Sequence, residues 1–230
     1  ETHTSQVTPN SYIETFAPLL AEGKSVLYLS LSSGLTKTFD SVNLAAAELA
    51  EEYSAARVVA VDTLCATGGM GLILEAAAKN RADGLSIDEN AAWLNEHRLD
   101  VVHWFMVDDL MYLKRGGRIP AATAVLGTAL NIKPLLKIDN EGHLITLEKK
   151  RGYKLALKGL ALKYAAARDV SQNRVYIVHG DCPEHADELE QLVKSVNPQA
   201  DITKMLLCPI IGAHTGPGMA AVIFFGNRNL

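Results

Sequence analysis

The feature that most constrains the fold is an alternation of short apolar runs with helical segments in the first half of the chain. Three runs have the pattern of strands: residues 25–31, 57–62 and 101–107. Val42 and Leu49 belong to a helical repeat between the first two runs. A glycine-rich turn at residues 67–71 leads into another helix, and a capping box of Ser86 and Glu89 opens a third. This alternation predicts right-handed crossovers and a parallel sheet containing all three strands.

The second half of the chain has a different order of elements. A basic turn at residues 113–120 is predicted to precede a helix of small residues over 121–130. The later segments predict a β-hairpin over residues 133–148, a helix over 152–167 and a strand over 174–179. A helix from Pro183, a strand over 202–208, a loop over 209–218 and a last strand over 219–225 follow. We therefore expect an α/β protein with a parallel-sheet lobe over about residues 1–100 and a mixed α/β lobe over about 101–230, with a ligand cleft between them.

Composition excludes several classes of protein. Twenty-two basic against 26 acidic residues give a net charge of −4, and nonspecific nucleic-acid binding needs a basic face. The longest apolar stretches, residues 121–132 and 219–225, are shorter than the ~20 residues of a membrane span. The three cysteines are odd in number and lack ligand spacing, which favours a reducing, cytoplasmic setting. No integral membrane span and no nucleic-acid partner are expected.

Ser32, Ser33 and Gly34 follow the first predicted strand and precede a helix. The carboxyl end of a parallel strand is where ligands bind in open α/β sheets, and free main-chain N–H groups there attract anions. Serine and glycine are also common helix-capping residues. A small anion site and a helix cap therefore both remain open for this segment.

His214 is predicted to lie in a glycine-rich loop, residues 212–218, as a general base or an anion clamp, or simply in a turn. Serine hydrolysis is disfavoured because the chain lacks the G-x-S-x-G motif. Arg118 closes a basic turn that is not a P-loop. It is either solvated or reaches into the cleft to pair with an anion. Asp108 and Asp109 are assigned to the start of a helix rather than to a metal site.

Six motifs together resemble the DegV family of bacterial fatty-acid-binding proteins over the whole length of the chain. They are Thr4-Ser5-Gln6, Ser32-Ser33-Gly34-Leu35, Val61-Asp62-Thr63, residues 113–119, Lys133-Pro134 and residues 212–218. The resemblance implies two α/β lobes with one long-chain fatty acid in a tunnel between them. It also implies a carrier subunit that presents the fatty-acid carboxylate to a separate ATP-dependent kinase subunit. The acyl phosphate so formed goes to a downstream acyltransferase of phospholipid synthesis.

The resemblance also implies roles for individual residues. Thr4, Ser33 and His214 would hold the carboxylate, and Arg118 would act at the headgroup in phosphoryl transfer or in partner docking. The supporting loops would be formed by four further residues: Ser32, Gly34, Gly216 and Gly218. No catalytic residue, metal or cofactor is expected in such a carrier. The alternatives are a small-molecule phosphotransferase that uses Ser33, Arg118 and His214, and a structural or regulatory interaction protein. The absence of a P-loop and of an acidic metal cluster disfavours the phosphotransferase.

The chain departs from the family pattern in two places. Family members usually have Leu-Ser-Gly-Thr after the serine pair, where this chain has Leu35-Thr36-Lys37-Thr38. Lys37 is expected to point into solvent. Family members also have about 60 residues before the T-S-Q motif, including a first strand. We therefore expect residues 1–230 to form one DegV-type domain that lacks this N-terminal segment.

Overall fold

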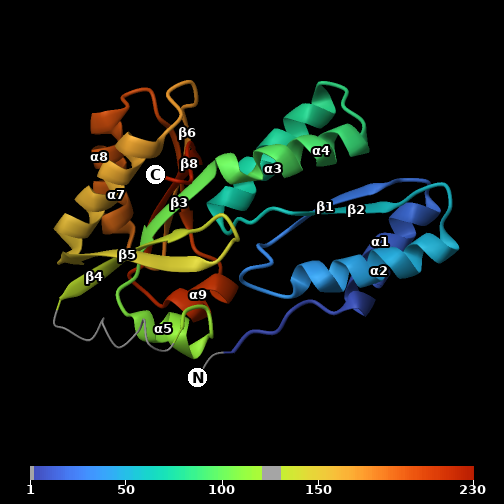
Figure 1. Cartoon of the computed structure of the whole chain (residues 1–230), viewed down its shortest axis with the longest axis horizontal. Helices are drawn as coiled ribbons and strands as arrows, with labels where there is room; N and C mark the ends of the chain where they lie inside the picture. Colours follow the sequence, from blue (N-terminus) through green and yellow to red (C-terminus); the bar gives the residue numbers. More distant parts are fainter. Residues whose placement is uncertain (1–2, 121–130) are drawn as a thin grey trace.

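Two separate sheets organise the chain in the computed structural model, which describes residues 3–120 and 131–230. The first sheet has two parallel strands, β1 (Val26–Ser30) and β2 (Val58–Asp62), paired in register from Val26 and Val58. The second sheet has six strands in the order β5-β4-β3-β8-β6-β7. Its strands are β3 (Val101–Met106), β4 (Ile132–Ile138), β5 (Leu144–Arg151), β6 (Arg174–His179), β7 (Asp201–Leu206) and β8 (Ala220–Phe225). The two sheets form two lobes that lie side by side (Figure 1).

The smaller lobe is built on β1 and β2. Helices α1 (Pro9–Ala21) and α2 (Thr38–Glu52) pack against these strands, and α4 (Ile87–His97) lies against β2. The lobe has a core of its own, in which Tyr12 and Phe16 of α1 meet Val42 and Leu49 of α2. The Ser86–Glu89 capping box that begins α4 is present, as the sequence predicts.

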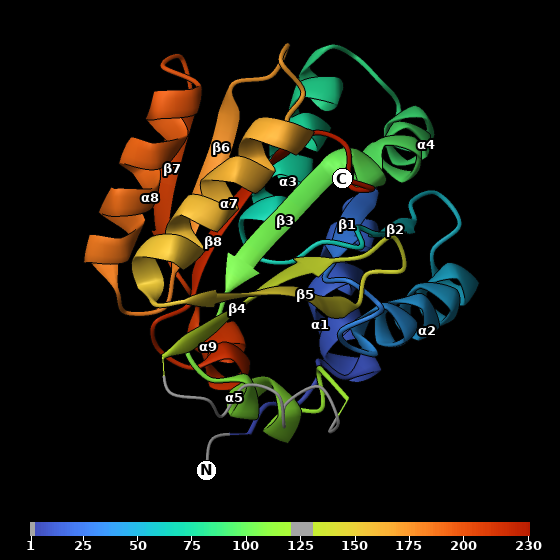
Figure 2. The same ribbon diagram turned by 60° about the vertical axis from the view of Figure 1, so that its left-hand side comes forward.

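The larger lobe is a sheet covered on both faces. Helices α7 (Tyr153–Ala167) and α8 (Pro183–Val196) cover one face, and α3 (Gly68–Ala82) covers the other (Figure 2). The hairpin of β4 and β5 and strands β6 and β8 lie within three residues of their expected bounds. Except for the parallel β6–β7 pair, the neighbouring strands are antiparallel. The predicted helix over residues 121–130 lies outside the described residues.

The prediction that the third strand belongs to the parallel sheet is wrong. Strand β3 lies in the six-stranded sheet, antiparallel to both β4 and β8. Its residues are buried on both faces, with Phe105 in the core beside α3 and Trp104 in the core beside α7. A strand covered on both faces is apolar throughout whether its neighbours run parallel or antiparallel, so the pattern did not identify its partners.

The glycine-rich stretch before α3 is the first turn of that helix rather than a turn ahead of it. Helix α3 begins at Gly68 and contacts β3, β6 and β8, so it carries the chain from one lobe to the other. A Cβ atom at Gly68 would lie 2.6 Å from Cβ of Tyr176 on β6. Glycine is therefore required here by the close approach of the helix to the sheet.

Two short helices lie at one end of the six-stranded sheet. Helix α5 (Leu110–Arg115) begins after Asp109, whose carboxylate accepts a hydrogen bond from the Met111 main-chain N–H, as expected for a residue at a helix start. Helix α9 (Pro209–Thr215) occupies most of the segment predicted as a loop, so that prediction is wrong. Across the described ranges, no helix has the length and apolar character needed to cross a bilayer.

Candidate functional site

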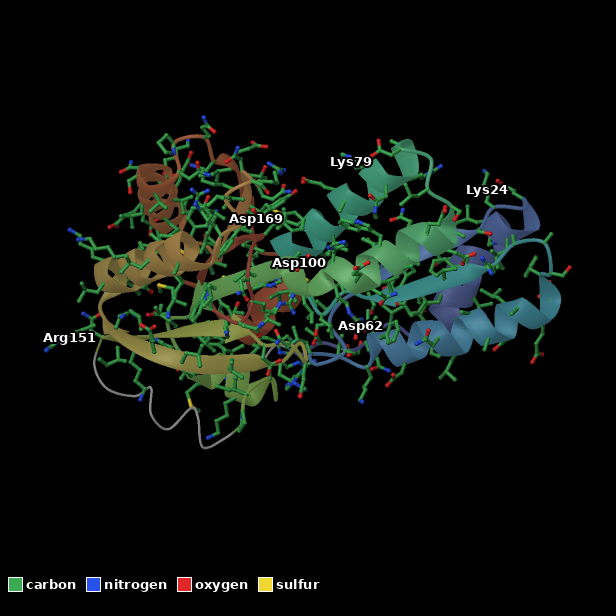
Figure 3. All side chains as sticks on the ribbon, turned by 45° about the horizontal axis from the view of Figure 1, so that its top comes forward. Lys24, Asp62, Lys79, Asp100, Arg151 and Asp169 are labelled. Atoms are coloured by element: carbon green, nitrogen blue, oxygen red, sulfur yellow. The ribbon has the colours of Figure 1, made fainter. Side chains whose placement is uncertain are left out.

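A cavity of about 700 Å³ lies between the lobes. The smaller lobe contributes Thr4, Tyr28 and Ser33 to its wall, and the larger lobe contributes Phe105 and His214, among other residues. The sequence predicted a ligand cleft at this place. Volumes of this size are typical of small-molecule sites. The end of β2 at Asp62 lies where the smaller lobe meets the larger one (Figure 3).

The wall of the cavity has an apolar side and a polar side. The apolar side is formed mainly by one face of β8 and its neighbour β3, because side chains at i and i+2 on a strand face the same way. Its apolar residues are Met219, which directly precedes β8, Ala221 and Ile223 of β8, and Phe105 of β3, and His103 of β3 lies on the same face. The polar side contains all four residues assigned to the headgroup by the resemblance: Thr4, Ser33, Arg118 and His214. They come from four segments that are distant in sequence.

Thr4 and His214 join the two lobes directly. Thr4 Oγ1 lies 2.7 Å from His214 Nε2. His214 is in the last turn of α9 rather than in the predicted loop, and its ring is half-buried. Burial, together with the charge of Arg118, lowers the pKa of His214 below its usual range. The imidazole is therefore neutral at neutral pH and offers one N–H donor and one acceptor nitrogen.

Gly116 fixes the position of the His214 ring. A Cβ atom at Gly116 would lie 2.1 Å from Nδ1 of His214, and that buried nitrogen has no hydrogen-bond partner within the described chain. The backbone at the end of α5 has an ordinary φ of −72° at Gly116, so the need for glycine there is steric. Packing against this glycine turns Nε2 of the ring toward Thr4.

Replacing Gly116 with alanine is expected to displace the His214 ring and break its contact with Thr4. Such overpacking should cost about 1–3 kcal/mol of stability. The measurement is the NMR chemical shift of the His214 ring protons, which should change strongly in Gly116→Ala. Gly212→Ala is the matched control, because nothing lies within 4 Å of a Cβ atom there. An unchanged His214 spectrum in Gly116→Ala would contradict this packing.

Ser33 and Ser32 have different surroundings despite being adjacent. Ser33 is exposed on the cavity wall, and its main-chain N–H donates to Asp62 Oδ1 at 3.1 Å. Ser32 is fully buried, and its hydroxyl donates to the Gly142 carbonyl at 2.8 Å and accepts from the Gly34 N–H at 3.2 Å. Of the two serines, Ser33 is therefore the one that lines the cavity, whereas Ser32 supports the loop.

The main-chain N–H groups of this segment are already used within the protein. Those of Ser33 and Gly34 are bonded as above, and those of Leu35 and Thr36 donate to the Ser32 carbonyl. Helix α2 begins only at Thr38 and has no side-chain cap. The helix-cap interpretation is therefore wrong for the two serines, and an anion at this place would meet the Ser33 hydroxyl rather than free N–H groups.

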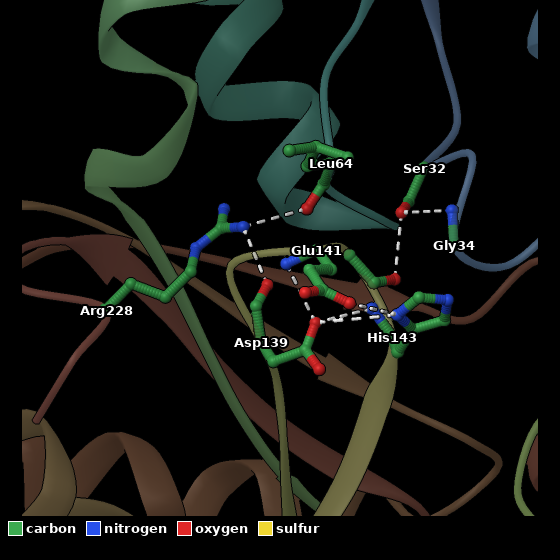
Figure 4. Close-up of polar contacts among 8 residues, drawn as sticks. Ser32, Gly34, Leu64, Asp139, Glu141, His143 and Arg228 are labelled. Atoms are coloured by element: carbon green, nitrogen blue, oxygen red, sulfur yellow. Dashed lines mark hydrogen bonds and ion pairs between the residues drawn. The ribbon is translucent and has the colours of Figure 1, made fainter.

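The turn of the β4–β5 hairpin, in the larger lobe, contacts loops of the smaller lobe. Gly34 packs so closely on it that a Cβ atom would lie 2.5 Å from the Gly142 carbonyl carbon. Figure 4 shows the Ser32–Gly142 hydrogen bond beside Arg228, which donates to the carbonyls of Leu64 and Asp139. These contacts fix the hairpin turn against two loops of the smaller lobe.

Gly216 and Gly218 shape the connection between α9 and β8. Both have left-handed backbone conformations, with φ of +71° and +77°. A Cβ atom on either would lie 2.6 Å from a tyrosine, Tyr112 or Tyr153. Neither glycine lines the cavity. They allow the chain to leave α9 and enter β8 in a tight turn beside His214.

Arg118 reaches across from the end of α5 to the smaller lobe. Its Nε donates to the Leu35 carbonyl at 3.0 Å, and a second N–H donates to the Gly116 carbonyl. The side chain lines the cavity, which favours the second of the two interpretations made from sequence, an arginine in the cleft. Two of its five N–H donors are used in these bonds.

Several residues of the cavity wall were not anticipated from the sequence. Tyr12 and Tyr28 line the cavity, and their hydroxyl groups are hydrogen-bonded at 2.8 Å. His103 of β3 is 3% exposed, and burial together with the charge of Arg228 lowers its pKa to about 3. The sequence shows that His103 and Phe105 lie two residues apart and so on one face of a strand, but not that this face lines the cavity. Across the part of the chain that the structure describes, no group of three His, Cys, Asp or Glu side chains is placed to hold a metal ion.

Comparison with protein families supplies relatives over nearly the whole chain. The family model described as "Uncharacterised protein, DegV family" matches residues 1–227. A DegV domain-containing protein of Clostridium perfringens is 39% identical over 226 residues, which are 97% of this chain and 77% of the relative. One from Lactococcus lactis is 36% identical over 227 residues, 99% of this chain and 78% of the relative.

Solved structures share the fold. A DegV family protein of Thermus thermophilus, described by its fatty acid binding, is 30% identical with a TM-score of 0.80, covering 97% of this chain and 79% of that one. A Thermotoga maritima protein, described as revealing a fatty acid binding function, is 28% identical with a TM-score of 0.80, covering 97% and 77%. The Streptococcus pneumoniae fatty acid kinase B3 protein, loaded with linoleic acid, is 20% identical with a TM-score of 0.87, covering 97% and 78%.

Proposed function

The chain belongs to the DegV family, and we propose that it binds one long-chain fatty acid in the cavity between its lobes. The observation that carries the proposal is the division of the cavity wall into polar and apolar sides. Thr4, Ser33, Arg118 and His214 converge from four segments on the polar side, and an apolar track follows β8. Relatives of known structure at 28% and 30% identity that are described as binding fatty acids support it.

The two sides of the cavity match the two parts of a fatty acid. The carboxylate needs hydrogen-bond donors when it leaves water, and hydroxyls, an imidazole and a guanidinium supply them. The tail needs apolar walls. Burying ~14 methylenes at ~0.8 kcal/mol each contributes ~11 kcal/mol before the costs of association, which is enough for tight retention.

In this proposal the protein is a carrier in the cytoplasm rather than an enzyme by itself. A separate ATP-dependent kinase subunit phosphorylates the bound carboxylate, and an acyltransferase consumes the acyl phosphate in phospholipid synthesis. The fold shared with the fatty acid kinase B3 protein of Streptococcus pneumoniae is compatible with this role. Arg118, at the polar side of the cavity, is the residue that we assign to the headgroup during phosphoryl transfer or partner docking.

Binding of palmitate to site variants tests the proposal. Ser33→Ala and His214→Ala each remove a polar group that we assign to the carboxylate, so each should weaken binding about 10- to 100-fold, since a hydrogen bond to a charged group contributes ~1.5–3 kcal/mol. The measurement is displacement of a fluorescent fatty acid, with circular dichroism to confirm folding. Ser171→Ala is the control, since its hydroxyl bonds Asp169, and neither residue lines the cavity. Unchanged affinity in both site variants would refute the site.

A further inference from the structure

Two residues with cationic side chains line the cavity, and none of the lining residues that the structure describes carries a carboxylate. The cations are Lys37 and Arg118, and they share the wall with the neutral polar groups of Thr4, Ser33 and His214. A fatty-acid carboxylate brings one negative charge to this wall. A phosphate monoester brings about 1.5 to 2 negative charges at pH 7. The charge of the wall therefore matches the phosphate better.

The carboxylates of Asp62 and Asp40 lie close to this wall but are not among its lining residues. Asp62 is buried and accepts hydrogen bonds from the main-chain N–H groups of Ser33 at 3.1 Å and Leu64 at 3.2 Å. Asp40 lies 3.7 Å from Lys37 Nζ, but the two side chains are 64% and 78% exposed. Exposed pairs of this kind contribute little, so the ammonium group is free to swing toward the cavity.

The position of Lys37 is not explained by the stability of its helix. Lys37 is the residue before the first turn of α2, and it makes no side-chain cap. A cation at a helix N-terminus is electrostatically unfavourable. An anionic headgroup in the adjoining cavity would turn this unfavourable charge into a favourable one.

We propose that Lys37 is a specificity-determining residue. Together with Arg118 it makes the cavity retain a single-chain lipid with a dianionic phosphate headgroup in preference to the carboxylate of the same chain. The inference rests on the proposed function, because it concerns a single-chain lipid with a phosphate in place of the carboxylate in the same cavity. Arg118 offers a planar fork of donors, and Lys37 supplies a mobile point charge.

Affinities of palmitate and hexadecyl phosphate for the unmodified protein and for Lys37→Gln test the inference. Because electrostatic attraction scales with the charge of the ligand, the affinity of the variant should fall about tenfold for hexadecyl phosphate and about threefold for palmitate. Lys37→Arg should restore the preference, and added salt should reduce it. Lys24→Gln is the matched control, since Lys24 is paired with Glu22 away from the cavity and should leave both affinities unchanged.

Equal losses for the two ligands in Lys37→Gln, or no loss for either, would overturn the inference. A third ligand, 1-palmitoyl lysophosphatidate, carries its phosphate beyond a glycerol unit and should bind more weakly than hexadecyl phosphate. Equal affinity with the same dependence on Lys37 would show a glycerolipid site instead and would also overturn it. If the unmodified protein binds palmitate and only the Lys37 effect is missing, the inference fails alone. If it binds no palmitate, the proposed function fails.

Discussion

Replacing Ala221 with phenylalanine should weaken palmitate binding about a hundredfold while leaving the protein folded. Ala221 lines the cavity between Met219 and Ile223 on the same face of β8. A phenyl ring there would occupy the space of about four methylenes of the tail, each contributing ~0.8 kcal/mol. The loss should grow with the length of the fatty acid, because a short tail needs less of the apolar track. Titration with palmitate and decanoate measures both effects.

The control for this variant is Ala165→Phe on the exposed side of α7, which adds the same ring away from the cavity. Thermal unfolding of Ala221→Phe should show a cooperative transition close to that of the unmodified protein, since the ring fills existing space. Full palmitate affinity in a folded Ala221→Phe protein would place the tail elsewhere and contradict the path along β8.

Replacing Arg228 with methionine should destabilise the protein by about 3–5 kcal/mol, the cost of breaking a buried polar network. Arg228 is 2% exposed, and its guanidinium donates to the main-chain carbonyls of Val101, Leu64, Asp139 and Arg98. Methionine fills similar space but leaves these carbonyl oxygens without their donor. Chemical denaturation measures the difference in the free energy of unfolding.

Arg57→Met is the matched control for Arg228→Met. Arg57 pairs with Asp88, but the two side chains are 55% and 68% exposed, so its removal should cost less than about 1 kcal/mol. Arg228 also fixes the hairpin turn and the Leu64 loop beside the cavity. We therefore expect Arg228→Met to lower palmitate affinity as well. A destabilisation no larger than that of the control would show that these buried bonds are not important.

Local elements with their own sequence signals were predictable from the chain. The Ser86–Glu89 capping box and the β4–β5 hairpin turn depend on residues that lie close together in sequence, and both are present. The partners of β3 were not predictable, because its burial on both faces produces the same apolar run in either kind of sheet. Helix α9 was missed because Gly212 within it and Gly216 directly after it are equally typical of a loop.

The site was predictable only in part. The resemblance selected Thr4, Ser33, Arg118 and His214, and the structure brings all four to one cavity. It did not reveal that the main-chain N–H of Ser33 is already bonded, since this depends on the carboxylate of Asp62 from another strand. Lys37 was expected to point into solvent, and its side chain is 78% exposed, yet it also lines the cavity.

Native mass spectrometry of the purified protein shows whether the cavity holds one fatty acid. We expect a one-to-one adduct that, after organic extraction, is identified as a fatty acid of roughly 14 to 18 carbons, a length whose buried methylenes give tight retention. Protein stripped of lipid should regain the same stoichiometry with added palmitate or oleate. A folded protein that carries no lipid and takes up neither acid would contradict the account.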